Sequence, residues 1–131
     1  MALSVGLALV GCGKEGDERN KVLAAIDRLQ EAPARDYAAR KAAAADLLGL
    51  KLETEPAVRA RDACGNAYRK LAESNEMSEA IQKELEDSAK KSDPADLVNR
   101  LKASEALLGE AEPLLERCKQ AKADLVAAIG R

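Results

Sequence analysis

Residues 94–129 read PADLVNRLKASEALLGEAEPLLERCKQAKADLVAAI. A row of mostly apolar or small side chains runs through them at alternating spacings of four and three residues: Leu97, Leu101, Ser104, Leu108, Ala111, Leu115, Cys118, Lys122, Leu125 and Ile129. This alternation is the heptad seam of helices that pack side by side. Lys122 is its one charged member. The stretch therefore predicts one long helix, packed against other helices in a bundle.

Pro113 lies inside this row. A proline ring within a helix clashes with the carbonyl group four residues earlier, which here belongs to Gly109. We expect a kink at this point, with the helix continuing beyond it.

Two further stretches of similar length show helical spacing. Residues 57–91 carry the row Ala60, Cys64, Ala67, Leu71, Ser74, Ser78, Ile81 and Leu85. Residues 17–48 carry apolar positions at helical spacing on both sides of Pro33. The connections between the three stretches are short, and Pro56 and Pro94 suit the first turns of the second and third helices. The sequence predicts an all-α fold, an up-down-up three-helix bundle of about 17–48, 57–91 and 94–129. Asn75 leaves open a break within the second helix.

The composition of the 131-residue chain excludes several functional classes. Its net charge is −2, it has no His, Trp or Phe, and Tyr37 and Tyr68 are its aromatic residues. Without His, neither a Ser-His-Asp triad nor the usual zinc site can form. A nucleic-acid binder typically has a basic face and stacking rings. We therefore expect one small non-enzymatic domain, with no metal or other cofactor and no nucleic-acid partner.

The start of the chain resembles a lipoprotein signal peptide. The first ten residues, MALSVGLALV, are uncharged, and the chain becomes polar after Cys12. The run is too short to span a bilayer, which needs about 20 residues, but it has the length of a signal-peptide core. The boundary Leu9-Val10-Gly11-Cys12 resembles the lipobox of bacterial lipoprotein precursors. It departs from the usual signal-peptide pattern in having no basic residue before the apolar run.

The resemblance implies a processing route and a location. Residues 1–11 would be cleaved off between Gly11 and Cys12. The Cys12 thiol would carry the lipid that holds the protein to the membrane, with residues 12–16 as a short tether and 17–131 as the bundle domain. Because Gly13 and not Asp follows the cysteine, the resemblance implies the outer membrane, with the bundle facing the periplasm. The alternative is an N-terminal helix that ends in a chance cysteine.

The other two cysteines are predicted to pair. An antiparallel hairpin that turns at about residues 92–93 places Cys64 and Cys118 within one helical turn of facing each other, and both lie on apolar rows. We expect a Cys64–Cys118 disulfide, which for a loop of this length stabilises a fold by about 3–4 kcal/mol. The alternatives are two buried free thiols and a redox-active or metal-binding pair.

Several weaker candidate sites have ordinary structural interpretations. Gly65 and Asn66 favour close approach of a neighbouring helix over a ligand contact, and Tyr68 is expected to pack over the disulfide. Tyr37 is a possible anchor for a partner. The carboxylates Glu110, Glu112 and Glu116 gather near Pro113 and are expected to be a solvated face. Small side chains at Ser74 and Ser78 allow helices to approach.

The function favoured by these patterns is that of a membrane-anchored envelope lipoprotein, acting as a non-enzymatic binding or structural module with an envelope protein as partner. One alternative is a small-ligand or sensing bundle with a cavity at the Pro113 kink, lined by Leu71, Leu108 and Leu115. A less favoured one is a cell-wall-active enzyme that uses Glu112 and Glu116 alone.

Overall fold

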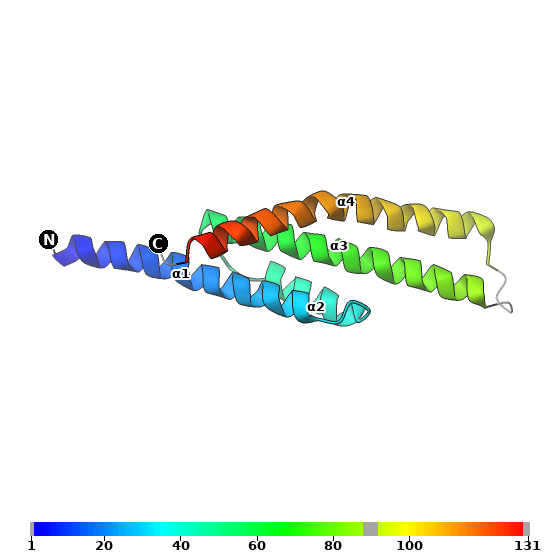
Figure 1. The fold of residues 1–131 in the computed structure, drawn as a ribbon, viewed down its shortest axis with the longest axis horizontal. Helices are drawn as coiled ribbons and strands as arrows, with labels where there is room; N and C mark the ends of the chain where they lie inside the picture. Colours follow the sequence, from blue (N-terminus) through cyan, green and yellow to red (C-terminus); the bar gives the residue numbers. More distant parts are fainter. Residues whose placement is uncertain (1, 88–91, 130–131) are drawn as a thin grey trace.

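The computed structural model describes the backbone of residues 2–87 and 92–129, and their side chains from residue 13 onward. These residues form four helices and no strand: α1 (Ala2–Glu31), α2 (Tyr37–Leu48), α3 (Glu55–Glu86) and α4 (Pro94–Ala127). The predicted all-α class is confirmed. The helices alternate in direction, and the start of α1 and the end of α4 lie at the same end of the molecule (Figure 1).

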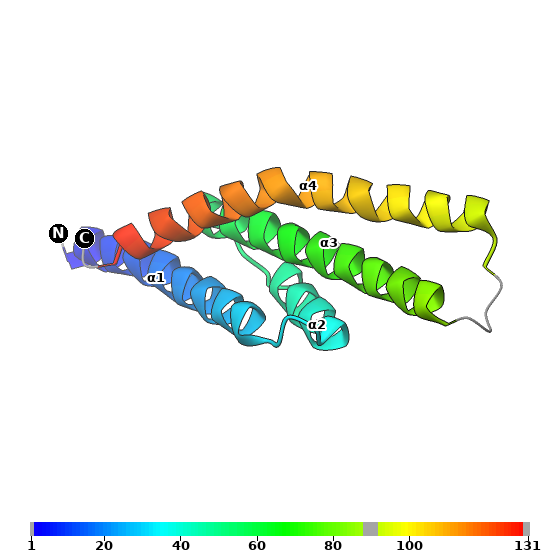
Figure 2. The ribbon, with the colours of Figure 1, turned by 45° about the vertical axis from the view of Figure 1, so that its right-hand side comes forward.

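The predicted count of three helices is wrong, because the first predicted helix is two. α1 ends at Glu31 and α2 begins only at Tyr37. Pro33 has no amide hydrogen to donate, and it disfavours helical geometry in the residue before it. Asp36 then starts a new helix by accepting a hydrogen bond from the Ala39 amide at 3.0 Å. The chain reverses here, and α2 runs back along α3 (Figure 2).

Residues 13–16, predicted to be a short tether, belong to α1, which is continuous from Ala2. Lys14 and Glu15 are good helix formers, and adding residues to an existing helix is much easier than starting one. Within the described part of the chain, no helix is long and apolar enough to cross a membrane.

The bounds of the two long helices follow the sequence signals closely. α3 begins one residue before Pro56 and runs through Asn75 without a break to Glu86. Of its predicted end, residues 88–91 lie outside the described residues. α4 begins at Pro94, with Asp93 accepting from the Ala95 amide at 3.1 Å. It runs through Pro113 and is bowed in its middle part (Figure 1).

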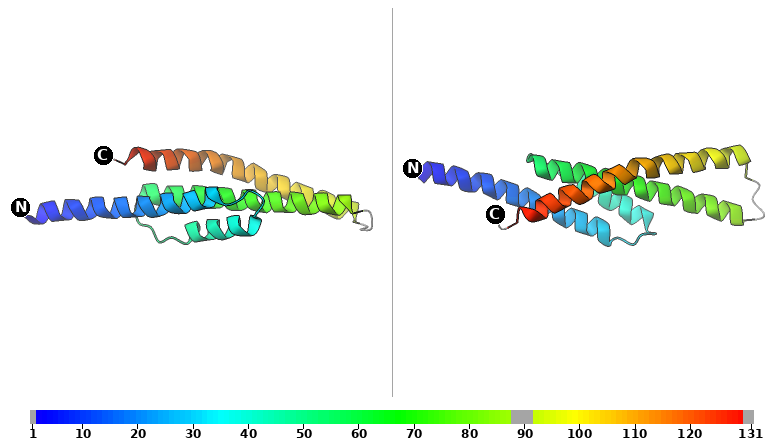
Figure 3. Two further views of the ribbon diagram at one scale, coloured as in Figure 1. Left: turned by 60° about the horizontal axis from the view of Figure 1, so that its bottom comes forward. Right: turned by 45° about the horizontal axis from the view of Figure 1, so that its top comes forward.

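The hydrophobic core lies in the half of the molecule where all four helices meet. Its largest fully buried side chains are Val22, Ile26, Leu29, Leu47 and Cys64. Beyond the end of α1 and the turn into α2, the ribbon consists of α3 and α4 alone (Figures 2 and 3). We call residues 71–112 the distal hairpin, and the described residues of 13–70 and 113–129 the proximal bundle.

Candidate functional site

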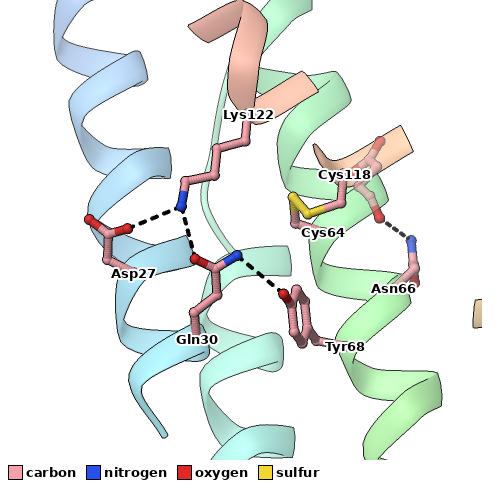
Figure 4. The surroundings of a disulfide bond; sticks show 8 residues. Asp27, Gln30, Cys64, Asn66, Tyr68, Cys118 and Lys122 are labelled. Atoms are coloured by element: carbon pink, nitrogen blue, oxygen red, sulfur yellow. Dashed lines mark hydrogen bonds and ion pairs between the residues drawn. A yellow bond between two sulfur atoms is a disulfide. The ribbon is translucent and has the colours of Figure 1, made fainter. Parts of the chain in front are cut away.

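The two cysteines of the predicted pair face each other in the proximal bundle. Cys64 of α3 and Cys118 of α4 have Cα atoms 4.6 Å apart and sulfur atoms at disulfide distance. Both side chains are buried. The structure thus brings together the two residues that the helical register had placed opposite each other (Figure 4).

Gly65, next to this cysteine, marks a close helix approach, as expected. A Cβ atom at Gly65 would lie 2.5 Å from Cγ of Leu48 at the end of α2. Any larger side chain would therefore push α2 away from α3. Asn66, on the following position, donates from its amide group to the Asp62 carbonyl at 2.8 Å and so stays within its own helix.

A chain of polar contacts joins α1, α3 and α4 beside the disulfide (Figure 4). The Lys122 ammonium donates to the Gln30 side-chain oxygen at 2.8 Å and lies 3.5 Å from a carboxylate oxygen of Asp27. The Gln30 amide group in turn donates to the Tyr68 hydroxyl at 3.1 Å. The one charged residue of the α4 heptad row therefore meets an acidic partner on α1.

An open groove with a volume of about 660 Å³ lies along these contacts. Gln30 and Tyr68 form one side, and α4 forms the other through Leu115, Glu116, Cys118, Lys119, Lys122, Ala123, Val126 and Ala127. Most of this wall is apolar, with Lys119 and Lys122 as its cations. Tyr68 lines the groove with Cys118, close to its expected place over the disulfide. Leu115 of the cavity predicted at the Pro113 kink lies here, whereas Leu71 and Leu108 do not line it.

Glu18 is a buried acid that the sequence analysis missed. Its side chain is 7% exposed. Its carboxylate accepts from the amides of Glu53 and Thr54, the latter at 2.8 Å, and from the Thr54 hydroxyl at 2.7 Å. These groups surround the N-terminus of α3, where helix amides lack partners. The backbone hydrogen bond from Thr54, followed by its hydroxyl, holds the pKa of Glu18 below its ordinary value. A signal was present, because Glu18 precedes Val22 by four residues on the buried row of α1.

Tyr37 ties α2 to α3 and does not stand free as an anchor. Its hydroxyl donates to the Glu79 carboxylate. This hydrogen bond is the main cause of a raised pKa for Tyr37 and of a lowered pKa for Glu79. Lys41 and Glu76 add an ion pair of 3.0 Å between the same two helices.

Small hydroxyl side chains hold the distal hairpin together. The hydroxyls of Ser74 and Ser104 each donate to the other residue's carbonyl, at 2.9 and 3.0 Å. The Ser78 hydroxyl lies 2.9 Å from that of Ser104. The expectation that Ser74 and Ser78 allow close approach of helices is confirmed. The hairpin is therefore closed by these polar contacts together with a few buried apolar side chains, such as Ile81 and Ala111.

The three carboxylates near Pro113 do not act together. Glu110 pairs with Lys70 across the two long helices at 2.7 Å. Glu112 and Glu116 are exposed. Among the described residues, no group of three or more His, Cys, Asp or Glu could hold a metal ion.

The distal hairpin leaves part of the heptad seam uncovered. Every seventh residue of α4 forms the row Leu101, Leu108, Leu115 and Lys122, and on α3 the matching row is Cys64, Leu71, Ser78 and Leu85. Of the proximal members, Cys64 lies in the core, Lys122 meets α1 and Leu115 lines the groove. The distal leucines are more open: Leu85 is 66% exposed, Leu101 41% and Leu108 39%. We call Leu71, Ser78, Leu85, Leu101 and Leu108 the open seam.

The proposed lipid attachment point lies where only the backbone is described. Gly11 and Cys12 belong to the first turns of α1, and their side chains lie outside the described residues. Comparison with protein-family models, with curated proteins and with solved structures finds no significant match for the chain.

Proposed function

We propose that this chain is a lipid-anchored protein of the bacterial cell envelope whose helical bundle serves as a non-enzymatic binding module. The observation that carries the binding role is the open seam, since apolar side chains uncovered in a row mark surfaces that other molecules cover. The lipobox-like boundary at Gly11 and Cys12 supports the anchor. The Gly13 that follows favours the outer membrane, with the bundle in the periplasm.

The positions of these two features support a division of labour. The start of α1 lies at one end of the molecule and the distal hairpin at the other (Figures 1 and 3). α4 alone has 34 residues, which at 1.5 Å per residue is roughly 50 Å. An anchor on Cys12 would therefore hold the open seam well away from the membrane surface, where it can meet another envelope component.

The anchor is tested by the intact mass of the protein extracted from its native membranes, with and without a reductant. We expect a chain that lacks residues 1–11, carries acyl chains on Cys12 and gains two hydrogens on reduction of the disulfide. The Cys12→Ala variant should keep its full length and leave the membrane fraction. An unprocessed wild-type chain without lipid contradicts the anchor.

The binding role is tested by site-specific photocrosslinking in intact cells. A photoreactive residue at Leu101, in the open seam, is compared with one at Val126, which is similarly exposed in the proximal bundle. We expect a discrete adduct from position 101 that position 126 does not give. No adduct from position 101, together with an unchanged envelope in a deletion strain, contradicts the binding role.

The groove beside the disulfide favours a second function, the binding of a small amphiphile. Its apolar wall suits a hydrocarbon body and its Lys119 an anionic head group. The fluorescent anion anilinonaphthalene sulfonate is a direct probe. Its emission should rise with the folded protein and fall when Ala123→Trp fills the groove. Equal emission from both proteins contradicts this function.

A further inference from the structure

The open seam continues the surface on which α1 already lies. In the proximal bundle, Lys122 of the α4 row contacts Asp27 and Gln30 of α1. Leu108 and Leu101 continue the same row where α1 has ended. The occupant that fits beside these two rows is therefore a third helix, as in the proximal bundle.

The length of the open seam sets the size of that helix. Leu71 and Leu85 are fourteen residues apart on α3, or roughly 21 Å along the axis. About four helical turns cover that distance. A helix that binds in such a place presents apolar residues at spacings of three and four.

The charge of the distal hairpin sets the character of the partner. Residues 71–112 contain 11 Asp and Glu but only 5 Lys and Arg, whereas the rest of the chain contains 12 and 16. Glu105 and Glu112 each follow an open-seam leucine by four residues and are exposed. Neither makes an ion pair within the described part of the chain. Complementary charge favours a basic partner, and a second copy of this chain would bring a second acidic hairpin.

We propose that the open seam is the docking site for a basic amphipathic helix of a partner protein. This inference rests on the proposed function in treating the bundle as a binding module, but it does not depend on the lipid anchor. The leucines of the seam take the apolar stripe of the helix. Acidic residues such as Glu105 and Glu112 take its Lys or Arg side chains.

The probe is a fluorescein-labelled synthetic peptide of about 18 residues, with Leu at the heptad a and d positions and Lys elsewhere. Titrated with the full chain in its disulfide form, it should bind saturably and lose affinity as salt is added. One control peptide keeps the leucines and carries Glu in place of Lys, and another has the same composition in scrambled order. We expect both to bind at least about tenfold more weakly.

Matched variants locate the binding site. Leu101→Ser combined with Leu108→Ser should weaken binding by about tenfold or more, whereas Val126→Ser should change it less than about twofold. The three side chains are all exposed, so the variants should fold, and circular dichroism checks this. Amide chemical shifts of the wild-type protein give a second measurement. They should move on peptide addition in residues 71–86 and 97–112, and not in α1.

Three results overturn the inference. One is equal binding of the scrambled peptide, or of the Leu101→Ser, Leu108→Ser variant, which would leave only general charge attraction. Another is shift changes confined to the groove that contains Val126. The third is a wild-type dimer in sedimentation equilibrium that the Leu101→Ser, Leu108→Ser variant dissolves, which would make the occupant a second copy.

The lipid anchor and the docking of a basic helix are tested by separate measurements, so one can be contradicted without the other. Peptide binding by the Cys12→Ala variant should equal that of the wild type. If the protein is lipidated and crosslinks a partner through position 101 but does not bind the peptide, the proposed function stands and only the docking of a basic helix is contradicted. If the protein carries no lipid but binds the peptide, the lipid anchor is contradicted and the docking site stands.

Discussion

The proximal bundle and the distal hairpin are built from the same two helices, yet they are closed in different ways. In the proximal bundle, α1 and α2 pack against α3 around Ile26, Leu29 and Leu47, and α1 also meets the end part of α4. In the distal hairpin, the two helices meet through Ser74 and Ser104. The start of α2 reaches α3 there through Tyr37 and Lys41, and the leucines farther along the hairpin stay exposed. The heptad rows are continuous across both regions, so the difference lies in what covers them.

Pro33 accounts for this difference. A first helix that ran unbroken to residue 48 would lie beside α3 and α4 for nearly their whole length. Because the chain turns back after Glu31, α2 packs against α3 in the middle of the molecule, and Leu85, Leu101 and Leu108 stay exposed. A single proline in one helix thus creates an open apolar surface on two others.

Loss of the disulfide that joins α3 to α4 in the proximal bundle is expected to have one of the two largest effects on stability. Cys64→Ser combined with Cys118→Ser removes a cross-link between residues 54 apart, and we expect a loss of about 3–4 kcal/mol in the free energy of unfolding. Urea denaturation with and without a reductant measures it. A reductant that leaves the wild-type midpoint unchanged would show that the cross-link contributes no stability.

A matched pair of truncations compares the two regions directly. Ile26→Ala opens a cavity in the proximal core and should cost about 2–5 kcal/mol. Leu101→Ala removes a half-exposed side chain from the distal hairpin and should cost less than about 1 kcal/mol. Urea denaturation of both variants is the measurement, and equal losses would contradict the division into closed and open regions.

A smaller change in stability is expected where α2 approaches α3 closely, and its sign depends on Leu48. Gly65→Ala gains helix propensity of up to about 1 kcal/mol, but its Cβ collides with Leu48. We expect a net loss of about 1–2 kcal/mol. In a Leu48→Ala background the same change should stabilise the protein, because the colliding atoms are gone. Thermal unfolding measures both variants. Destabilisation of similar size in both backgrounds would show that the contact with Leu48 is not the cause of the lost stability.

The smallest effect depends on pH and concerns the Glu18 carboxylate at the start of α3. Because its pKa in the folded state lies below the ordinary value of 4.5, the ionised group stabilises the fold above that pH. This contribution is lost as the pH falls through the folded-state pKa. Glu18→Gln should lower the melting temperature by a few degrees at neutral pH and lose less on acidification than the wild type.

The exposed Glu15 on the same helix provides the control for this prediction, since Glu15→Gln should leave the melting temperature at neutral pH nearly unchanged. If the difference in melting temperature between wild type and Glu18→Gln persists undiminished well below pH 4.5, the effect does not come from the charge of the Glu18 carboxylate.

The sequence predicted the hairpin of the two long helices well but not the course of the first. Heptad spacing and the Asp93-Pro94 start fix the register of α3 against α4, so Cys64 and Cys118 could be placed together. Pro33 and Pro113 look alike in sequence, but their surroundings differ. Pro113 stands between seam residues that hold the helix on both sides, whereas Pro33 is followed by Asp36, which can begin a new helix.

The site was predicted only in part, because exposure depends on packing that a single sequence does not display. Leu101 and Leu125 belong to one row and are the same residue type, yet the first is half exposed and the second is buried. The partners of Glu18, the amides of Glu53 and Thr54, lie on a connector far along the chain, so the sequence alone does not show that they satisfy its carboxylate.

Native-state hydrogen exchange, read residue by residue, tests the central claim most directly. Amides of α3 around Cys64 should exchange only by global unfolding, and those from Ser78 to Leu85 by much smaller openings. Adding the basic amphipathic peptide should slow exchange in the distal hairpin alone. Equal exchange rates along α3, unaffected by the peptide, would contradict the division into a closed proximal bundle and an open distal hairpin that binds a partner helix.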